Sequence, residues 1–167
     1  MRRHTNILIL LLLTGLCISA GAQNNPYKID DSLYPIFQRA IKWRTQPQGL
    51  LIADTLYAEA TQKKDKKAQC LALTIPVSFY LSTNNYEKLE QAATRAKEEA
   101  RKNNYLQYYY SACTNEINCL LNNGHSLRAL QKAEEMKIQA FKDQHEYGIF
   151  SCIFTLSLIH ISEPTRP

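Results

Sequence analysis

Residues 89–100 read LEQAATRAKEEA, and their small and apolar positions recur forty residues earlier and forty residues later. Alanines occupy the same two places in all three segments, with an apolar residue between them. Because these positions lie three and four residues apart, they form one face of an α-helix. The equivalent sets are Ala53, Ala93 and Ala133, then Leu56, Ala96 and Met136, then Ala60, Ala100 and Ala140.

A second apolar stripe precedes each of these segments, with its positions spaced by four. Its equivalent sets are Leu33, Leu73 and Cys113, then Phe37, Val77 and Ile117, then Ile41, Leu81 and Leu121. Turn-forming residues separate the two stripes of each unit, namely 45–47, Asn84-Asn85 and 122–124, where Asn and Gly suit the end of a helix. We therefore predict that each unit forms a hairpin of two helices.

The predicted helices cover 32–44 and 48–62, 67–83 and 86–102, 105–122 and 125–142, and a seventh begins near Glu146. A single hairpin cannot bury its apolar stripe, whereas stacked hairpins share a continuous core. We therefore predict an all-α fold, an α-solenoid of stacked helix hairpins with a forty-residue repeat. Its units are 32–65, 66–104, 105–145 and a partial fourth unit at 146–155. Pro76 lies inside a predicted helix and is expected to kink it.

The N-terminal residues 1–22 have the pattern of a secretory signal peptide. Arg2 and Arg3 precede an apolar run from Ile7 to Ile18, and small residues precede the expected cleavage between Ala22 and Gln23. An uncleaved anchor is the alternative, but a membrane-spanning helix needs ~20 apolar residues. We expect an exported protein, periplasmic or in the cell envelope, with a linker at 23–31.

Residues 156–167 resemble one translated reading frame of a sequencing-library adapter, residue for residue through Arg166. We interpret this stretch as an artefact and exclude it from fold prediction. The alternative is a natural tail that follows a short apolar segment. On our interpretation the repeats stop inside a helix, whose apolar face should remain uncovered.

The charge balance argues against a nucleic-acid-binding surface. Without residues 1–22 and 156–167, 17 Lys plus Arg face 14 Asp plus Glu, a net charge of +3. This excess is too small for a basic nucleic-acid footprint, and charges of both signs alternate along the predicted helices.

Four cysteines remain, and their spacing fits neither a zinc site nor a CxxC redox pair. Cys113 and Cys119 lie six residues apart, about 240° around one helix, so they point away from each other. Cys70 with Cys113, or Cys113 with Cys152, could pair across neighbouring helices. We favour four small buried hydrophobic residues, because Cys is among the most buried residue types.

No catalytic constellation is present in this sequence, so we expect no enzyme activity, no cofactor and no metal. His125 and His145 lie at predicted turns and belong to no set with ligand spacing. The acidic stretch Asp30-Asp31-Ser32 is better explained if Asp31 or Ser32 caps the first helix.

From Ser32 to about Thr155 the units resemble the tetratricopeptide-repeat family in a long-helix variant. The resemblance rests on the order of small and apolar positions: Leu33, Phe37, Ala40, Gly49, Ala53 and Leu56 in the first unit, Leu73, Val77, Tyr80, Leu89, Ala93 and Ala96 in the second, and Cys113, Ile117, Leu120, Ala129, Ala133 and Met136 in the third. The units depart from the family in lacking its consensus Trp, and only the third has Gly, Gly124, at its turn.

This resemblance implies a concave inner wall, formed by the first helix of each hairpin, that binds peptides or protein segments. Mapping by register places six uncharged hydrogen-bonding residues there, namely Tyr34, Gln38, Thr74, Ser78, Thr114 and Asn118. Plain helix exposure explains them equally well. Tyr105, Tyr108 and Tyr109 could add an aromatic anchor, while Tyr110 is better suited to packing between units.

The resemblance implies a protein- or peptide-binding scaffold module of the bacterial cell envelope. Its layout resembles the periplasmic sensory region of two-component or DNA-binding regulators, so we expect the N-terminal fragment of a longer signalling protein. The alternatives are the repeat region of an envelope enzyme with a separate catalytic domain, and a freestanding envelope assembly factor. The expected partner is a protein or peptide, with membrane contact only through the signal segment or a downstream helix.

Overall fold

The computed structural model describes residues 25–162, and within that range every regular element is a helix. The helices are α2 (Tyr34–Lys42), α3 (Pro47–Gln62), α4 (Lys66–Ser82), α5 (Tyr86–Lys102), α6 (Leu106–Asn122), α7 (Ser126–Lys142) and α8 (Glu146–Ser162). The all-α prediction is confirmed, and the predicted helix ends lie within two residues of these bounds. The predicted signal segment, with its cleavage between Ala22 and Gln23, lies outside the described residues.

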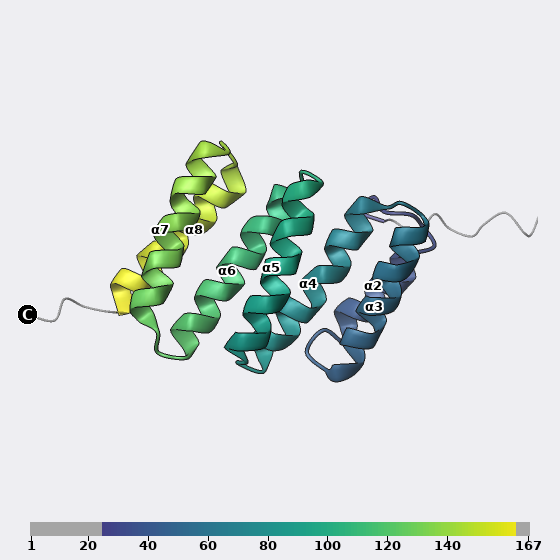
Figure 1. The fold of residues 1–167 in the computed structure, drawn as a ribbon, viewed down its shortest axis with the longest axis horizontal. Helices are drawn as coiled ribbons and strands as arrows, with labels where there is room; N and C mark the ends of the chain where they lie inside the picture. Colours follow the sequence, from purple (N-terminus) through teal and green to yellow (C-terminus); the bar gives the residue numbers. More distant parts are fainter. Residues whose placement is uncertain (1–24, 163–167) are drawn as a thin grey trace, which may run out of the picture.

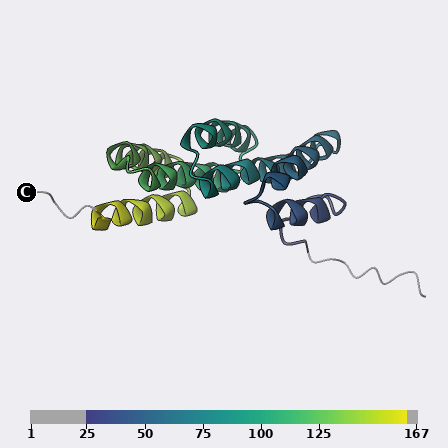
Figure 2. The ribbon, with the colours of Figure 1, turned by 90° about the horizontal axis from the view of Figure 1, so that it is seen from below.

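The helices follow one another along the long axis of the molecule (Figure 1). Each helix contacts the next in sequence, and α4 also contacts α2 and α6, while α6 contacts α8. Seen from below, α2 and α8 lie on the same side of α4 and α6, and α5 lies on the other (Figure 2). This curvature turns one side of α2, α4, α6 and α8 towards a common space.

The five connections that follow α3 are three residues long and share one hydrogen-bond pattern. After α3, the Lys64 N–H donates to the Thr61 carbonyl at 3.1 Å, and the Asp65 N–H donates to the Ala60 carbonyl at 2.9 Å. This is a Schellman turn, which requires a left-handed residue at its centre. The central residues are Lys64, Asn84, Asn104, Gly124 and Gln144, and all have positive φ. The prediction that Asn84 and Gly124 end helices is confirmed.

The last residue of each of these connections also begins the next helix. The carbonyl of Asp65 accepts the Gln69 N–H at 3.1 Å, and its carboxylate accepts the Ala68 N–H at 2.9 Å. Asn85 caps α5 in the same way, through Lys88. The same residue thus bonds to the end of one helix and to the start of the next. Consecutive helices are therefore held side by side by connections with little freedom to move.

The alanines of the repeated stripe are buried at every position that the sequence predicts. Ala93 and Ala100 on α5 are fully buried, and Ala96 is 3% exposed. Their equivalents on α3 and α7 are buried as well, namely Ala53, Leu56, Ala60, Ala133, Met136 and Ala140. Small side chains at these positions let α3, α5 and α7 lie close to their neighbours.

The start of α2 differs from the prediction that Asp31 or Ser32 caps it. Leu33 is the N-cap residue, and its side chain makes no capping hydrogen bond. Asp30 instead accepts hydrogen bonds from the N–H of Ser32 at 2.9 Å and from its hydroxyl at 2.6 Å. An Asp side chain that binds the backbone two residues ahead closes an Asx turn, so the acidic stretch folds on itself before α2 begins.

Helix α4 runs through Pro76 without a break. Helix α8 begins at Glu146 as predicted and continues past residue 155, where Leu156 and Ile159 are buried. Its other face exposes large apolar side chains, Phe150 at 69%, Phe154 at 56% and Ile153 at 52%. The expected uncovered face is therefore present, while the adapter interpretation of 156–167 stays a prediction.

None of the helices within residues 25–162 combines the length and the hydrophobicity that crossing a bilayer requires.

The turn geometry predicts opposite effects for two substitutions. Gly124→Ala should lower the free energy of unfolding by about 1 kcal/mol, because alanine is strained at a φ of +73°. Lys64→Gly should raise it by a few tenths to about 1 kcal/mol by relieving the same strain at +59°. Urea unfolding followed by circular dichroism measures both, with Lys63→Gly as the control. A stabilised Gly124→Ala variant would contradict this account of the turns.

Packing at the alanine stripe predicts a further effect on stability. Ala93→Leu should cost ~1 to 3 kcal/mol, because the fully buried site has no room for three more carbons. Ala58→Leu, at an exposed position of α3, is the matched control and should change the urea midpoint little. Equal midpoints for the two variants would show that Ala93 is not closely packed.

Candidate functional site

Two adjoining hollows lie on the side where α2, α4, α6, α8 and the segment before α2 come together. One encloses about 450 Å³ and the other about 390 Å³, and they share Tyr27, Gln107 and Tyr108. We call the two together the groove. It is lined by Pro26, Tyr27, Phe37, Ile41, Arg44, Lys67, Leu71, Thr74, Ile75, Ser78, Asn104, Tyr105, Leu106, Gln107, Tyr108, Ser111, His145 and Tyr147.

Aromatic rings form the centre of the groove. Tyr108 on α6 packs half-buried against the apolar cluster of α2 and α4. The ring of Tyr27 meets the edge of Phe37, with centroids 4.7 Å apart, and Phe37 is itself 2% exposed. Burial raises the pKa of Tyr108 to about 12, so its hydroxyl stays protonated at neutral pH.

Two of the six predicted wall residues line the groove. The hydroxyl of Thr74 donates to the Leu71 carbonyl at 2.7 Å, and that of Ser78 donates to the Thr74 carbonyl at 3.0 Å. Each hydroxyl has therefore used its proton within α4, and its oxygen remains able to accept a hydrogen bond from a ligand.

The other four predicted residues are not among those that line the groove. Tyr34 is buried in the core at 8% exposure, and Gln38 is exposed on α2. Thr114 and Asn118 are half-buried further along α6, where Thr114 donates to the Tyr110 carbonyl at 3.0 Å. The structure thus gathers part of the predicted set, and the peptide-binding role of the whole set stays a prediction.

The aromatic run at the start of α6 divides between two hollows and the core. Tyr105 and Tyr108 line the groove, whereas Tyr109 lines the hollow beside Glu116 and Tyr110 is fully buried. The ring of Tyr110 lies against Gly148, where an added Cβ would come within 2.7 Å of it. Tyr27 was missed because it belongs to the predicted linker, outside the repeat that guided the search.

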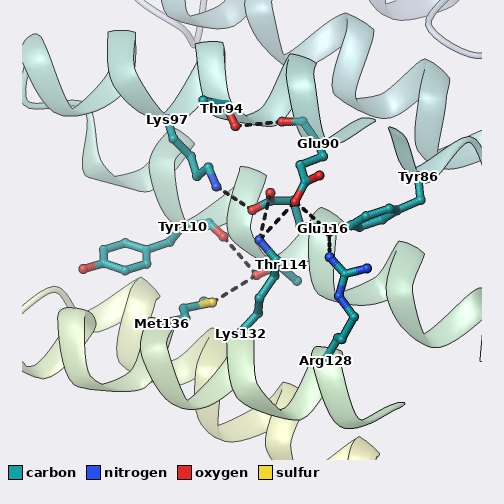
Figure 3. A network of polar contacts seen from close by, with 10 residues as sticks. All are labelled: Tyr86, Glu90, Thr94, Lys97, Tyr110, Thr114, Glu116, Arg128, Lys132 and Met136. Carbon is teal, nitrogen blue, oxygen red and sulfur yellow. Dashed lines mark hydrogen bonds and ion pairs between the residues drawn. The ribbon is translucent and has the colours of Figure 1, made fainter. Parts of the chain in front are cut away.

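A second polar cluster lies between α5, α6 and α7 (Figure 3). Glu116 on α6 has only 3% of its side chain exposed, and its carboxylate lies 2.6 Å from the Lys97 ammonium and 3.5 Å from that of Lys132. Burial alone would lower the pKa of Lys97, but the hydrogen bond and the charge of Glu116 reverse this and raise it. The cluster is an ion-paired tie between three helices.

The thiol beside this tie is not poised for reaction. Cys113 lines a hollow of about 220 Å³ next to Glu116. Burial raises the pKa of its thiol to about 11, so almost no thiolate, the nucleophilic form, exists at neutral pH. Cys70, Cys119 and Cys152 are buried, and all four described cysteines are free. The alternative of Cys70 or Cys152 pairing with Cys113 is therefore not realised in this structure.

A third polar cluster surrounds Asp143 in the connection before α8. Its carboxylate accepts hydrogen bonds from the Tyr110 hydroxyl at 2.6 Å, from Gln139 at 2.8 Å and from Arg101 at 3.1 Å. Burial acts to raise the pKa of Asp143, but these three hydrogen bonds outweigh it and lower the pKa. His145 stacks on Tyr110 with ring centroids 5.1 Å apart.

Both histidines lie in connections, as predicted. Across residues 25–162 no three His, Cys, Asp or Glu side chains are grouped in a way that could hold a metal ion.

Comparison of the chain with family models, with curated proteins and with solved structures gives no significant match.

The Asp143 cluster predicts a loss of stability in acid. A carboxylate with a lowered folded-state pKa stabilises the fold above its unfolded value of 3.8, and that contribution disappears as pH falls through the folded-state pKa. Asp143→Asn should therefore cost about 1 to 3 kcal/mol at pH 7, and much less near pH 2. Urea midpoints at both pH values measure this, with exposed Asp54→Asn as the control. An equal cost at both pH values would contradict the assignment.

Proposed function

We propose that residues 32–155 form an α-solenoid of stacked helix hairpins with a forty-residue repeat, similar to the tetratricopeptide-repeat family. Three turn residues with positive φ, Lys64, Asn104 and Gln144, are spaced by forty, and Asn84 and Gly124 keep the same interval. The buried alanines repeat at that interval too. Repetition of both turns and core supports one hairpin geometry used again along the chain.

We propose that this module binds a segment of another protein in the groove. The observation that carries the proposal is an open, aromatic-lined groove. It is lined by the first helix of each of four successive hairpins, α2, α4, α6 and α8. Each of its two hollows falls within the ~300 to 1,000 Å³ typical of ligand sites. Because Tyr108 is already half-buried in its free form, a ligand that covers it meets an ordered surface and loses little side-chain entropy.

An extended segment suits the span of the groove. Packed helices lie about 8 to 10 Å apart, so crossing from α2 to α8 covers roughly 25 to 30 Å. At about 3.3 Å per residue, a strand-like segment of about eight residues bridges that distance. The oxygens of Thr74 and Ser78 can accept from its N–H groups, and the phenols of Tyr105 and Tyr108 can donate to its carbonyls.

We propose binding in preference to catalysis. Glu116 is neutralised by two lysines, and Asp143 by an arginine with two further hydrogen bonds. Such groups stabilise the packing of helices and are not free to exchange protons with a substrate. A location in the cell envelope, as part of a sensory or scaffolding protein, remains our proposal from the pattern of residues 1–22 and from the layout of the repeats.

Peptide selection tests the groove. Dodecapeptides selected from a random phage library against the purified chain should bind Tyr108→Ala at least about tenfold more weakly, because the central ring is lost. Tyr108→Phe should retain most of the affinity that comes from stacking and burial. Leu127→Ala removes an exposed apolar side chain of α7, outside the groove, and should bind as the unchanged chain does. Fluorescence anisotropy gives the affinities.

If the selected peptides bind Tyr108→Ala and the unchanged chain equally, their site lies elsewhere and the proposal is wrong. Circular dichroism spectra of each variant guard against an effect of misfolding.

A further inference from the structure

We infer that the groove prefers an acidic segment in which carboxylate side chains lie on both sides of an aromatic or large aliphatic residue. This inference rests on the proposed function and specifies the chemistry of its ligand.

The charges of the groove carry the first step. Lys67 lines one hollow and Arg44 lines the other, whereas no Asp or Glu is among the lining residues of either. Within residues 25–162, Lys67 has no ion pair, and the Arg44 guanidinium, in the connection after α2, donates only to the Ile41 carbonyl at the end of that helix, at 3.2 Å. Both cations can therefore bind a ligand carboxylate without giving up an ion pair inside the protein.

The cation of Lys63, in the connection before α4, is already engaged. Lys63 pairs with Asp30 at 3.3 Å, and Asp65 accepts the Asp30 N–H at 2.7 Å and the Ala68 N–H at 2.9 Å. The carboxylates of Asp30 and Asp65 are thus occupied by hydrogen bonds in the turn before α2 and at the N-cap of α4. Lys67 is left facing the first hollow with its charge uncompensated by a direct partner.

Hydrogen-bond donors reinforce the preference for an anion. The phenols of Tyr27, Tyr105 and Tyr108 line the groove, and their hydroxyls make no hydrogen bond to another described residue. An ionised carboxylate has only acceptors, so it matches three hydroxyl donors and an ammonium better than an amide or an alcohol does.

The order of these groups sets the order of the ligand. Tyr27 and Tyr108 belong to both hollows, while Lys67 belongs to one and Arg44 to the other. The aromatic centre therefore lies between two cationic ends. A segment with an apolar residue over Tyr108 and a carboxylate towards each end satisfies all three places at once.

Three capped heptapeptides test the inference by fluorescence anisotropy. All have a core of leucine, phenylalanine and leucine, flanked on each side by two aspartates, two asparagines or two lysines, with acetylated and amidated ends so that no terminal charge contributes. The aspartate probe should bind about tenfold more tightly than its asparagine isostere, as expected for two partly exposed ion pairs. The lysine probe should bind most weakly. Salt at about 0.5 M should reduce these differences.

The double variant Lys67→Gln with Arg44→Gln should bind the aspartate and asparagine probes equally. Its matched control is Lys102→Gln with Arg39→Gln, which removes the same charges from exposed positions outside the groove and should keep the tenfold preference.

Each alternative outcome separates the inference from the proposed function. If the aspartate and asparagine probes bind equally, and Tyr108→Ala weakens both, the groove binds peptides without charge preference and the inference is wrong. If no probe binds at about 1 mM, or Tyr108→Ala has no effect, the proposed function fails as well. If a ten-nucleotide thymidine strand binds as tightly as the aspartate probe, the groove accepts any polyanion and the assignment to a peptide is overturned.

Discussion

The close approach of successive helices at their buried alanines is the constraint on which the rest of the structure depends. Ala53, Ala93 and Ala133 leave no side-chain bulk between helices, so each pair packs tightly along its length. The three-residue connections then leave no slack to absorb a different angle or separation. Small residues and short turns together fix the angle and the separation between each helix and the next. Repetition of the same angle makes the row of helices curve.

The groove is a product of that curvature and not of any single hairpin. Its residues come from four helices, from three of the connections and from the segment before α2, and no two neighbouring helices supply all of its parts. The ion-paired tie at Glu116 and the hydrogen bonds at Asp143 hold α5, α6 and α7 in place behind it. Polar groups in this protein thus divide into those that fix the scaffold and those, such as Lys67, that face the groove without a partner.

Helix positions could be predicted closely from the sequence because burial repeats with helical period and because Asn and Gly suit left-handed turns. The residues of the groove could not be predicted as well. Periodicity reports which face of a helix is apolar, but which exposed residues then meet depends on the curvature of the whole row. Thr74 and Ser78 line the groove, whereas Thr114 and Asn118 hold equivalent register positions on α6 and do not. Tyr27 lies outside the repeat and carries no periodic signal.

The position of Glu116 has a consequence for how the molecule opens. Its two lysines belong to the helices before and after it, so separating α7 from α6 would leave a carboxylate in the interior with half of its compensation, and separating α5 would do the same. Fraying from either end of the row therefore reaches this buried carboxylate before α5, α6 and α7 can separate. We expect these three helices to open as one cooperative block, although each contacts only its near neighbours.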